Sequence, residues 1–519
     1  MTLSKSQYIR GMQCHKSLWL FKNRPDLRET DDTQAESLFK KGIDVGELAK
    51  ELFPDGVEIV FDPDDFQKMI DKTMELIEND TEVIYESSFN ENGIFAMADI
   101  LVRNGNGWDM YEVKGSTSAR DKGVIKKHYL QDAAIQWYTL SQTITLNRAY
   151  IIHLNKEYEK NADLNVSKLF SIDDITQEVL EYQSNIGGHL KDFEIMLGDS
   201  MPEIDIGKHC GSPYHCDFSS HCWQHIPKNG SVFDISYAMG KQWDLYYQGV
   251  LSIDDIPDDF RLGANASLQI EHHRHGEIKI DKEQIRMFLD TIEYPINFFD
   301  FETFQNPIPR FNKQRPYQQV PFQYSLHVLY EDGRLEHKEY LGDEHSDPRP
   351  ALIEQMLDDI TPTGSIIAFN QSFEIRQIKD LALFSDTDAD ELLALNERFV
   401  DLAIPFQNKF YYHPNFQGKY SIKVVLPTLF PEDDELNYKN LGSIQNGGDA
   451  MDTYANLHLL KDLSKRDEIR KDLLAYCHLD TLAMVKIWEK LHSMVELKNQ
   501  IDGGTDEYPK NVSDDIAII

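Results

Sequence analysis

The sequence predicts an α/β protein with more than one domain. Apolar runs with the two-residue alternation of strands are interspersed with segments that have the apolar spacing of helices, an order typical of shared strand and helix layers. The chain has 519 residues, whereas single hydrophobic cores stop growing at about 250–300 residues. We therefore expect a first domain at residues 1–225, a connector at 226–290, a second domain at 291–495 and a flexible polar tail at 496–519.

The first domain is expected to open with helices, continue as strands and then add a helix and a last strand. The segment 103–107, Arg-Asn-Gly-Asn-Gly, separates two of the strands and has residues suited to the positive φ angles of a hairpin turn. The predicted helices are 4–21, 32–52 and 126–140, and the predicted strands are 57–61, 81–89, 93–102, 107–113 and 147–154.

The second domain is expected to alternate strands and helices, which indicates a mixed sheet covered by helices. Patterns in the connector are weaker, apart from a helix expected at 281–289. In the second domain, strands are predicted near Ile296, at 322–330, at 335–340 and near Ser365, and helices are predicted to begin near Arg349, Phe373 and Glu468.

Charge and hydropathy exclude some classes of protein. The net charge of −36 opposes binding to nucleic acid or anionic membranes over the whole surface. It does not exclude an enzyme in which metal ions and a local basic groove contact phosphates. No apolar run approaches the length needed to cross a bilayer, and the first residues lack the apolar core of a signal peptide. We expect a cytoplasmic protein without a membrane partner.

Two carboxylates at the end of an apolar strand are the most informative feature of the chain. Asp300 and Glu302 follow the apolar run 296–299, and alternate residues of a strand point to the same face. Adjacent carboxylates repel each other, and burial makes the pair costlier still. The pattern therefore predicts a site for a divalent cation.

Two further segments supply groups of the same chemistry. Asn370 and Glu374 follow the apolar strand 365–369. Tyr476 and Asp480 lie four residues apart in a helical stretch and therefore share a helix face. Cys477, inside the same stretch, is interpreted as a small core residue beside Asp480.

The order Asp-x-Glu, Asn-x3-Glu and Tyr-x3-Asp resembles the DEDD exonucleases of the DnaQ-like group, which have the RNase H-like fold. The resemblance implies that Asp300, Glu302, Glu374 and Asp480 hold two Mg²⁺ or Mn²⁺ ions, and that Tyr476 orients the attacking water. It also implies removal of nucleotides from a 3′ end. Glu374 departs from the family pattern, which usually has Asp there, and this puts the second metal position in question.

Two segments near these acids are rich in aromatic and basic residues. The proline-rich loop 306–317 contains three cations and two aromatic rings, which suit phosphate binding and base stacking and equally suit an ordinary surface loop. The stretch 411–423 adds further aromatic and basic side chains, for which the sequence indicates no role.

The first domain carries a second candidate centre. Asp99 lies in a predicted strand, and across the expected hairpin Glu112 and Lys114 share a strand face. Two carboxylates suit a metal that activates water, while a lysine stabilises developing charge. A hairpin with alternating solvated charges is the alternative.

This arrangement resembles the RecB-like PD-(D/E)XK nucleases, which have a restriction-endonuclease-like α/β core. The resemblance implies that Asp99, Glu112 and Lys114 are catalytic. In place of the Gln-x3-Tyr element of that group, the following helix pairs Asp132 with Gln136. The early histidine of the group is absent, and Glu47 or Glu86 is a candidate replacement.

Four cysteines have a one-plus-three layout, with Cys14 near the start and Cys210, Cys216 and Cys222 evenly spaced. Iron–sulfur RecB-like nucleases have the same layout, and four thiolates suit a [4Fe-4S] cluster. Structural zinc is the alternative, although its cysteines usually come in closer pairs.

Together these resemblances match a bacterial family of fused nucleases with an iron–sulfur RecB-like half and an RNase H-like half. They imply a metal-dependent nuclease that acts on nucleic acid, with DNA favoured over RNA, and a role in DNA repair or defence. The alternative is an iron–sulfur-stabilised nucleic-acid-binding or assembly protein in which a nuclease centre has decayed.

Overall fold

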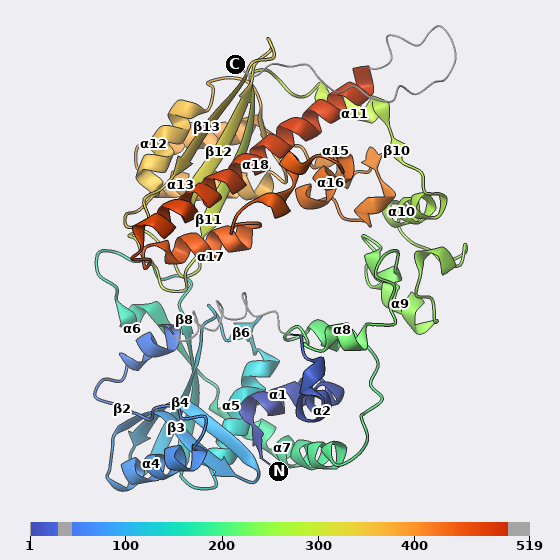
Figure 1. Cartoon of the computed structure of the whole chain (residues 1–519). Helices are drawn as coiled ribbons and strands as arrows, with labels where there is room; N and C mark the ends of the chain where they lie inside the picture. Colours follow the sequence, from blue (N-terminus) through green and yellow to red (C-terminus); the bar gives the residue numbers. More distant parts are fainter. Residues whose placement is uncertain (1, 30–43, 497–519) are drawn as a thin grey trace. The chain divides into compact units, whose positions relative to one another are not determined.

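The computed structural model describes residues 2–29 and 44–496, and the chain divides into two compact units. The first unit comprises Met1–Lys228, Thr303–Val320 and Tyr454–Asn456, and the second comprises Asn229–Glu302, Pro321–Thr453 and Leu457–Ile519. Both units combine helices with sheets, which confirms the predicted α/β class (Figure 1). None of the described helices is long and apolar enough to span a membrane.

The first unit is built on a mixed sheet with the order β2-β3-β4-β5-β8-β9 and β1 paired to β4. Antiparallel pairing joins β3 to β4 and β4 to β5, whereas β5 and β8 are parallel and connected through α5. The strands are β1 (Leu3–Ser4), β2 (Val57–Glu58), β3 (Val83–Glu91), β4 (Ile94–Asn104), β5 (Gly107–Lys114), β6 (Arg120–Asp121), β7 (Val124–Ile125), β8 (Leu146–Leu154) and β9 (Phe170–Asp174). The helices are α1 (Lys5–Gln13), α2 (His15–Asn23), η1 (Pro25–Leu27), α4 (Phe66–Glu78), α5 (Lys127–Leu140), α6 (Val166–Leu169), α7 (Thr176–Leu197), η2 (Lys208–Gly211) and α8 (Ser219–Cys222).

Most of the predicted strands of the first unit are confirmed, and so is the hairpin turn, in which Gly105 has a φ of 61°. The single helix expected over 4–21 is wrong, because the extended backbone of Cys14 separates α1 from α2. Helices α4 and α7 were not predicted. Residues 30–43 lie outside the described residues, so only the end of the helix expected over 32–52 is described, as helix at 44–50.

The second unit has a five-stranded mixed sheet with the order β13-β12-β11-β14-β15. Strands β12 and β13 are antiparallel, whereas β11, β14 and β15 are parallel neighbours. The strands of the unit are β10 (Lys279–Ile280), β11 (Ile296–Phe304), β12 (Val320–Leu329), β13 (Leu335–Leu341), β14 (Ile366–Ala368), β15 (Phe399–Asp401) and β16 (Tyr411–Tyr412). The helices before the sheet are η3 (Val232–Asp234), α9 (Lys241–Tyr247), η4 (Ile253–Asp255), α10 (Ala264–His275) and α11 (Lys282–Leu289).

The remaining helices cover the two faces of this sheet or lie at its edge. They are α12 (Arg349–Asp359), α13 (Ser372–Phe384), α14 (Ala389–Leu395), η5 (Asn396–Arg398), α15 (Ile404–Gln407), η6 (Pro414–Phe416), α16 (Ile422–Leu429), η7 (Asp434–Leu436), η8 (Tyr438–Asn440), α17 (Gly447–Leu457) and α18 (Leu463–Glu496). The connector expected at 226–290 falls mostly in this unit and has a small apolar core of its own. The tail beyond 496 lies outside the described residues.

The alternation of β11 decides which side chains face which layer. Phe299 and Phe301 point into a core formed with α12 and α13. The opposite face of the sheet lies against α18, which Figure 1 shows as the long helix crossing the strands. On that face Gln323 of β12 donates a hydrogen bond to the carbonyl oxygen of Leu473 in α18, at 2.8 Å. Residues Asp300 and Glu302 therefore point toward α18.

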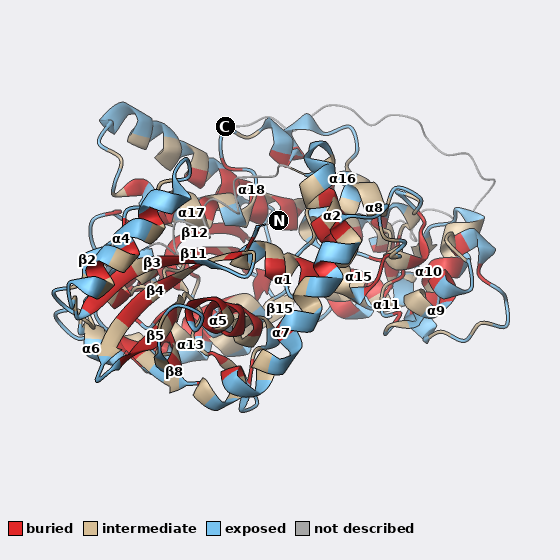
Figure 2. Cartoon of the chain, turned by 90° about the horizontal axis from the view of Figure 1, so that it is seen from below, coloured by how far each residue is buried: buried red, intermediate tan, exposed pale blue. Residues whose placement is uncertain are grey.

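The distribution of buried residues is similar in the two units. Buried positions are concentrated on the sheet strands, α5 and the inner face of α18, while the outer faces of the helices are exposed (Figure 2). All ten residues of β12 are buried, so both of its faces are covered. Polar groups on such a strand, such as Gln323 and Ser325, need hydrogen-bond partners within the fold.

Candidate functional sites

Three carboxylates meet in the second unit where β11 faces α18. Asp300, Glu302 and Asp480 each offer one oxygen, and these oxygens all lie within 4.8 Å of one another. Glu302 and Asp480 are buried. Hard oxygen ligands of this kind are those that Mg²⁺ and Mn²⁺ prefer. We call these three residues the carboxylate cluster.

Burial and mutual repulsion shape the electrostatics of the carboxylate cluster. Burial, followed by the charge of Asp480, raises the pKa of Asp300 and of Glu302 well above the ordinary range. Burial also raises the pKa of Asp480 to about 6, against the lowering effect of a hydrogen bond from Tyr438. Without a cation, the cluster therefore tends to bind protons near neutral pH.

Two tyrosines surround Asp480. The hydroxyl of Tyr438 donates a hydrogen bond of 2.5 Å to Oδ1 of Asp480. Tyr476 lies one helical turn before Asp480, and its ring centroid is 5.9 Å from that of Tyr438. Burial, followed by the charge of Asp480, raises the pKa of Tyr476 far above its usual value, so its hydroxyl is a neutral donor.

Lys423 of α16 is the cation associated with this group. Its ammonium lies 5.3 Å from the ring centroid of Tyr438 and 5.1 Å from that of Tyr476. Its positive charge acts to lower the pKa of each carboxyl of the cluster, less strongly than burial raises it. Sequence reasoning missed Tyr438 altogether and gave Lys423 no role, although Lys423 ends the aromatic and basic stretch 411–423.

Glu374 lies near the carboxylate cluster but outside the group of oxygens that fall within 4.8 Å. It is in the first turn of α13, is 3% exposed, and its Oε2 has no hydrogen-bond partner among the described residues. Burial raises its pKa to about 8, and the charges of Asp401 and Asp480 add to the rise. Glu374 is thus a fourth buried acid, and one of its carboxylate oxygens accepts no hydrogen bond from the described residues.

Cys477 is fully buried, as expected of a core residue, and it also contacts Asp300. Its Sγ lies 3.9 Å from both the carbonyl oxygen and Oδ2 of Asp300. Asp480 lies three residues further along α18 and its charge also acts on Cys477, so the expectation of a small core residue beside Asp480 is confirmed.

In the first unit, the structure brings Glu112 and Lys114 together as the strand alternation predicted. The ammonium of Lys114 lies 2.8 Å from Oε1 of Glu112 and also forms a short ion pair with Asp132. A second lysine, Lys5 of α1, lies 2.9 Å from the same Oε1. Gln136 donates a hydrogen bond of 2.7 Å to Oε2 of Glu112. Glu112 is therefore surrounded by donors, and Lys5 is a residue that sequence reasoning missed.

Lysines and carboxylates lie together in this group, and their charges shift one another's pKa values. Burial, then the charges of Asp132 and Asp99, raises the pKa of Glu112 to about 7. Burial acts to raise the pKa of Asp132, but Lys114 and Lys5 outweigh it and hold that pKa well below its usual value. Burial acts to lower the pKa of Lys114, but the surrounding carboxylates raise it overall.

Asp99 and the two candidate replacements for histidine lie in different surroundings. Oδ2 of Asp99 accepts a hydrogen bond of 2.7 Å from the backbone N–H of Val113. Burial raises the pKa of Asp99, and the charge of Glu86 contributes. Glu86 is therefore close to this group, and its φ of 57° marks an irregularity in β3. Glu47 is instead largely exposed and paired with Lys50 at 2.7 Å.

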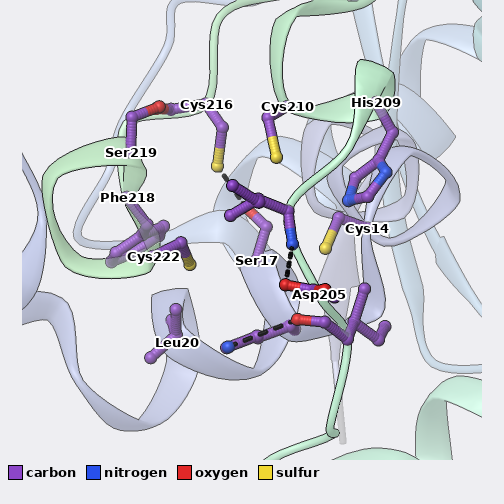
Figure 3. A pocket seen from close by; sticks show the side chains of 13 residues that line it. Cys14, Ser17, Leu20, Asp205, His209, Cys210, Cys216, Phe218, Ser219 and Cys222 are labelled. Atoms are coloured by element: carbon purple, nitrogen blue, oxygen red, sulfur yellow. Dashed lines mark hydrogen bonds between the residues drawn. The ribbon is translucent and has the colours of Figure 1, made fainter. Parts of the chain in front are cut away.

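The four cysteines of the one-plus-three layout line a single pocket of the first unit. Figure 3 shows the thiols of Cys14, Cys210, Cys216 and Cys222 around this pocket. No three of them have sulfur atoms within 4.8 Å of one another in the described chain. Thiolates bound tetrahedrally to one zinc ion lie only about 3.8 Å apart. The donor set, four thiols lining one pocket, thus fits a metal group.

Two of these sulfur atoms take part in weak hydrogen bonds, Cys210 as acceptor and Cys216 as donor. The backbone N–H of Gly207 donates to Sγ of Cys210, at 3.5 Å, and Cys216 Sγ lies 3.5 Å from the hydroxyl of Ser17. Burial raises the pKa of Cys14 and Cys222. Hydrogen bonds to the sulfurs are one of the means by which proteins tune iron–sulfur clusters.

The proline-rich loop 306–317 belongs to the first unit, although it follows Glu302 in the sequence. The hydroxyl of Tyr317 donates a hydrogen bond of 2.5 Å to the carbonyl oxygen of Gly115, which follows Lys114. The backbone N–H of Lys313 donates to the carbonyl oxygen of Lys160, at 2.8 Å. The loop is thus fastened to the first unit by backbone and hydroxyl groups.

Comparison with known proteins gives no functional assignment. A protein-family profile described as "Domain of unknown function (DUF2779)" matches residues 297–421, a span that contains Asp300, Glu302 and Glu374 and ends before Tyr438 and Asp480. The chain is similar to two proteins whose names call them uncharacterized: UU173 of Ureaplasma parvum serovar 3, with 26% identity over 44% of this chain, and MG366 of Mycoplasma genitalium, with 28% identity over 37% of this chain.

The chain spans about a third of the length of these relatives, 36% and 31% respectively. Among solved structures, the one titled "Crystal structure of SSO0001" is similar at a TM-score of 0.23 and 17% sequence identity, covering 43% of this chain and 85% of the other.

Proposed function

We propose that the second unit is a metal-dependent phosphodiesterase that hydrolyses nucleic acid, acting as a 3′-to-5′ exonuclease with DNA favoured as substrate. The observation that carries the proposal is the carboxylate cluster of Asp300, Glu302 and Asp480, whose oxygens lie within 4.8 Å of one another. Such a group is unfavourable in a buried site unless it binds protons or a cation. The order of its residues along the chain resembles the DEDD exonucleases, and an RNase H-like fold is part of the proposal.

The residues of the cluster would hold Mg²⁺ or Mn²⁺, with Glu374 available for a second ion. When bound, such ions activate water and stabilise the charge that develops during displacement at phosphorus. Tyr438 fixes the orientation of the Asp480 carboxylate through its hydrogen bond. Tyr476 presents a neutral hydroxyl that orients the attacking water.

The substrate side of the proposal depends on Lys423. A cavity beside the cluster is lined by Lys423, Tyr438, Lys439, Gln445 and Asn446, together with acidic residues of the 430s. Lysine and amide donors of this kind contact phosphate oxygens. The net charge of −36 opposes phosphate binding over the surface as a whole, so a local group of cations and amides has to supply it.

The first unit supports a second candidate activity, a RecB-like nuclease centre. The favourable observation is that Glu112, Lys114, Asp132 and Gln136 converge with Asp99 nearby. The four cysteines would hold a [4Fe-4S] cluster, which supplies a structural cross-link between the amino-terminal helices and residues 208–222. The two lysines that neutralise Glu112 favour the alternative, a decayed centre in a nucleic-acid-binding or assembly protein.

One assay separates these possibilities. Single- and double-stranded DNA and RNA, each labelled at one end, are incubated with Mg²⁺ or Mn²⁺ and with wild type, Asp480→Asn or Lys114→Ala. We expect Asp480→Asn to abolish shortening from the 3′ end. Loss of a separate internal cleavage in Lys114→Ala, measured well below the melting temperature of that variant, supports the second centre. Unchanged shortening by Asp480→Asn would contradict the proposal for the second unit.

The metal of the cysteine pocket is tested separately. Protein purified without oxygen is expected to be brown, with a broad visible absorbance that Cys216→Ala removes. Cys477→Ala is the matched control, because Cys477 lies in the other unit. Stoichiometric zinc without iron in the wild-type protein would contradict the iron–sulfur proposal.

A further inference from the structure

Three histidines form a compact group in the second unit that the proposed function does not use. His327 of β12, His337 of β13 and His478 of α18 each offer one ring nitrogen, and these nitrogens lie within 4.8 Å of one another. The ring centroids are 4.5 Å apart for His327 and His337, 4.9 Å for His327 and His478, and 4.4 Å for His337 and His478. We call these residues the histidine cluster.

The backbone positions the three rings without strain. His327 and His337 are direct partners in the antiparallel register of β12 and β13. His327 is on the same strand face as Ser325, which contacts Thr481 of α18 at 2.7 Å, so His327 also faces that helix. His478 lies three residues before Thr481, on the adjoining helix face. The group therefore joins two strands and one helix.

A chain of hydroxyl groups assigns the tautomer of two rings. Thr481 donates its hydroxyl hydrogen to the carbonyl oxygen of His478, at 3.1 Å, so it accepts from Nδ1–H of His327, at 2.8 Å. Ser325 then donates to Thr481 and accepts from Nε2–H of His337, at 3.1 Å. This assignment leaves a lone pair on Nε2 of His327 and on Nδ1 of His337.

Neutral rings with a free lone pair are the form in which histidine binds metals. We propose that the histidine cluster binds one divalent transition-metal ion of the zinc class, with one nitrogen from each of His327, His337 and His478. Imidazole suits zinc, copper and nickel, whereas the carboxylate cluster suits magnesium and manganese. The two clusters are thus selective for different ions.

The geometry requires only small side-chain adjustments. Nitrogens at about 2.0–2.1 Å from a tetrahedral ion are roughly 3.3 Å apart, so rotations of the rings suffice to close the observed separations. Glu339, on the same face of β13 as His337, has a carboxylate oxygen 3.9 Å from Nε2 of that ring, the nitrogen that does not bind the ion in this assignment. The hydroxyls of Ser325 and Thr481 act as outer partners that orient the rings.

A bound ion would tie β12 and β13 to α18, the helix that carries Tyr476 and Asp480. The inference does not depend on nuclease activity.

The test counts zinc bound by the full-length chain. Wild type, His337→Gln and the matched control His275→Gln are loaded with excess zinc and passed through a desalting column, and zinc per chain is measured by mass spectrometry. His337 is the most exposed ligand, with a side chain 26% accessible, so its replacement is the least disruptive. His275 is an exposed histidine at the end of α10.

We expect His337→Gln to hold one zinc ion fewer per chain than wild type and His275→Gln. Asp300→Asn should retain the ion that His337→Gln loses, so failure of the carboxylate proposal is distinguishable from failure of this one. Equal zinc counts in wild type and His337→Gln would overturn the inference.

A second measurement needs no variant. Crystals of the wild-type protein soaked in zinc should give an anomalous diffraction peak between the three rings. Peaks only at the cysteine pocket or the carboxylate cluster would overturn the inference.

Discussion

The two groups of buried acids differ in what neutralises them. In the first unit, Glu112 contacts the ammonium groups of Lys5 and Lys114 at 2.9 and 2.8 Å. In the second unit, no lysine or arginine of the described chain forms an ion pair with the carboxylate cluster. Its nearest associated cation, Lys423, lies over the rings of Tyr438 and Tyr476 instead.

This difference indicates which of the two sites needs a metal ion from solution. Acids that form ion pairs inside the fold are neutralised without metal, and removing the cationic partner leaves a buried charge unpaired. Acids whose charged neighbours are mainly other acids are neutralised by binding protons or a metal ion. The two sites should therefore respond in opposite directions when a charge is removed.

The largest effect is expected in the first unit. Lys114→Met leaves Glu112 and Asp132 with Lys5 alone, and breaking a buried ion pair costs about 3–5 kcal/mol. The melting transition of the first unit should fall accordingly in calorimetry, while that of the second unit stays in place. Lys72→Met is the control, because Lys72 is an exposed lysine paired with Glu75 and should matter little. An unchanged melting temperature in Lys114→Met would show that the acids of the first unit do not depend on Lys114 for neutralisation.

The next effect concerns the tyrosines of the second unit. Tyr438→Phe removes the hydrogen bond that orients Asp480, and losing such an outer partner typically lowers metal affinity or activity by roughly 10–100-fold. Tyr476→Phe should lower Mn²⁺ affinity less than Tyr438→Phe, because the hydrogen bond of Tyr476 acts less strongly on Asp480 than that of Tyr438. It should lower turnover more, because it removes the hydroxyl that we propose orients the attacking water. Mn²⁺ titration and single-turnover hydrolysis separate the two. Identical profiles for both variants would show that their roles are not distinct.

A smaller effect of opposite sign is expected for Asp300→Asn. The amide removes one of three repelling charges, so the metal-free second unit should gain stability on the order of 1 kcal/mol at pH 8. Denaturant unfolding in a chelator measures the gain. Asp467→Asn, an exposed position on the same helix as Asp480, is the control. Destabilisation by Asp300→Asn would mean that its charge is compensated within the fold.

The smallest effect is expected in the pH dependence of the stability of the metal-free second unit. The pKa of Glu374 rises from 4.5 to about 8 and that of Asp480 from 3.8 to about 6 on folding. The folded state therefore binds more protons than the unfolded chain between about pH 4 and pH 8, so the metal-free second unit loses stability as pH rises through this window. Saturating Mn²⁺ should flatten the slope. A slope that metal leaves unchanged would contradict the account.

Much of the local structure could be predicted from the sequence. Strand alternation placed Asp300 and Glu302 on one face, and helix spacing placed Tyr476 with Asp480, because both depend on neighbours within a few residues. Helix α7 was missed because Gly187 and Gly188 interrupt its pattern and its buried positions are sparse.

Contacts between distant segments could not be predicted in the same way. Tyr438 lies in a three-residue 3₁₀ helix, 42 residues before Asp480, and no local pattern marks it. Lys5 meets Glu112 across 107 residues. The histidines come from two strands and a helix, so only the sheet register and the packing of α18 bring them together.

The most direct test of the central claim is hydrolysis of single-stranded DNA, labelled at its 5′ end, by wild type and Asp300→Asn at the same Mn²⁺ concentration. We propose that the carboxylate cluster binds the metal that the reaction needs, so wild type should shorten the strand stepwise from its 3′ end. Several kcal/mol of transition-state stabilisation are lost with the metal, so Asp300→Asn should be slower by roughly 100-fold or more. Equal rates for the folded variant and wild type, or no shortening by either, would contradict the account.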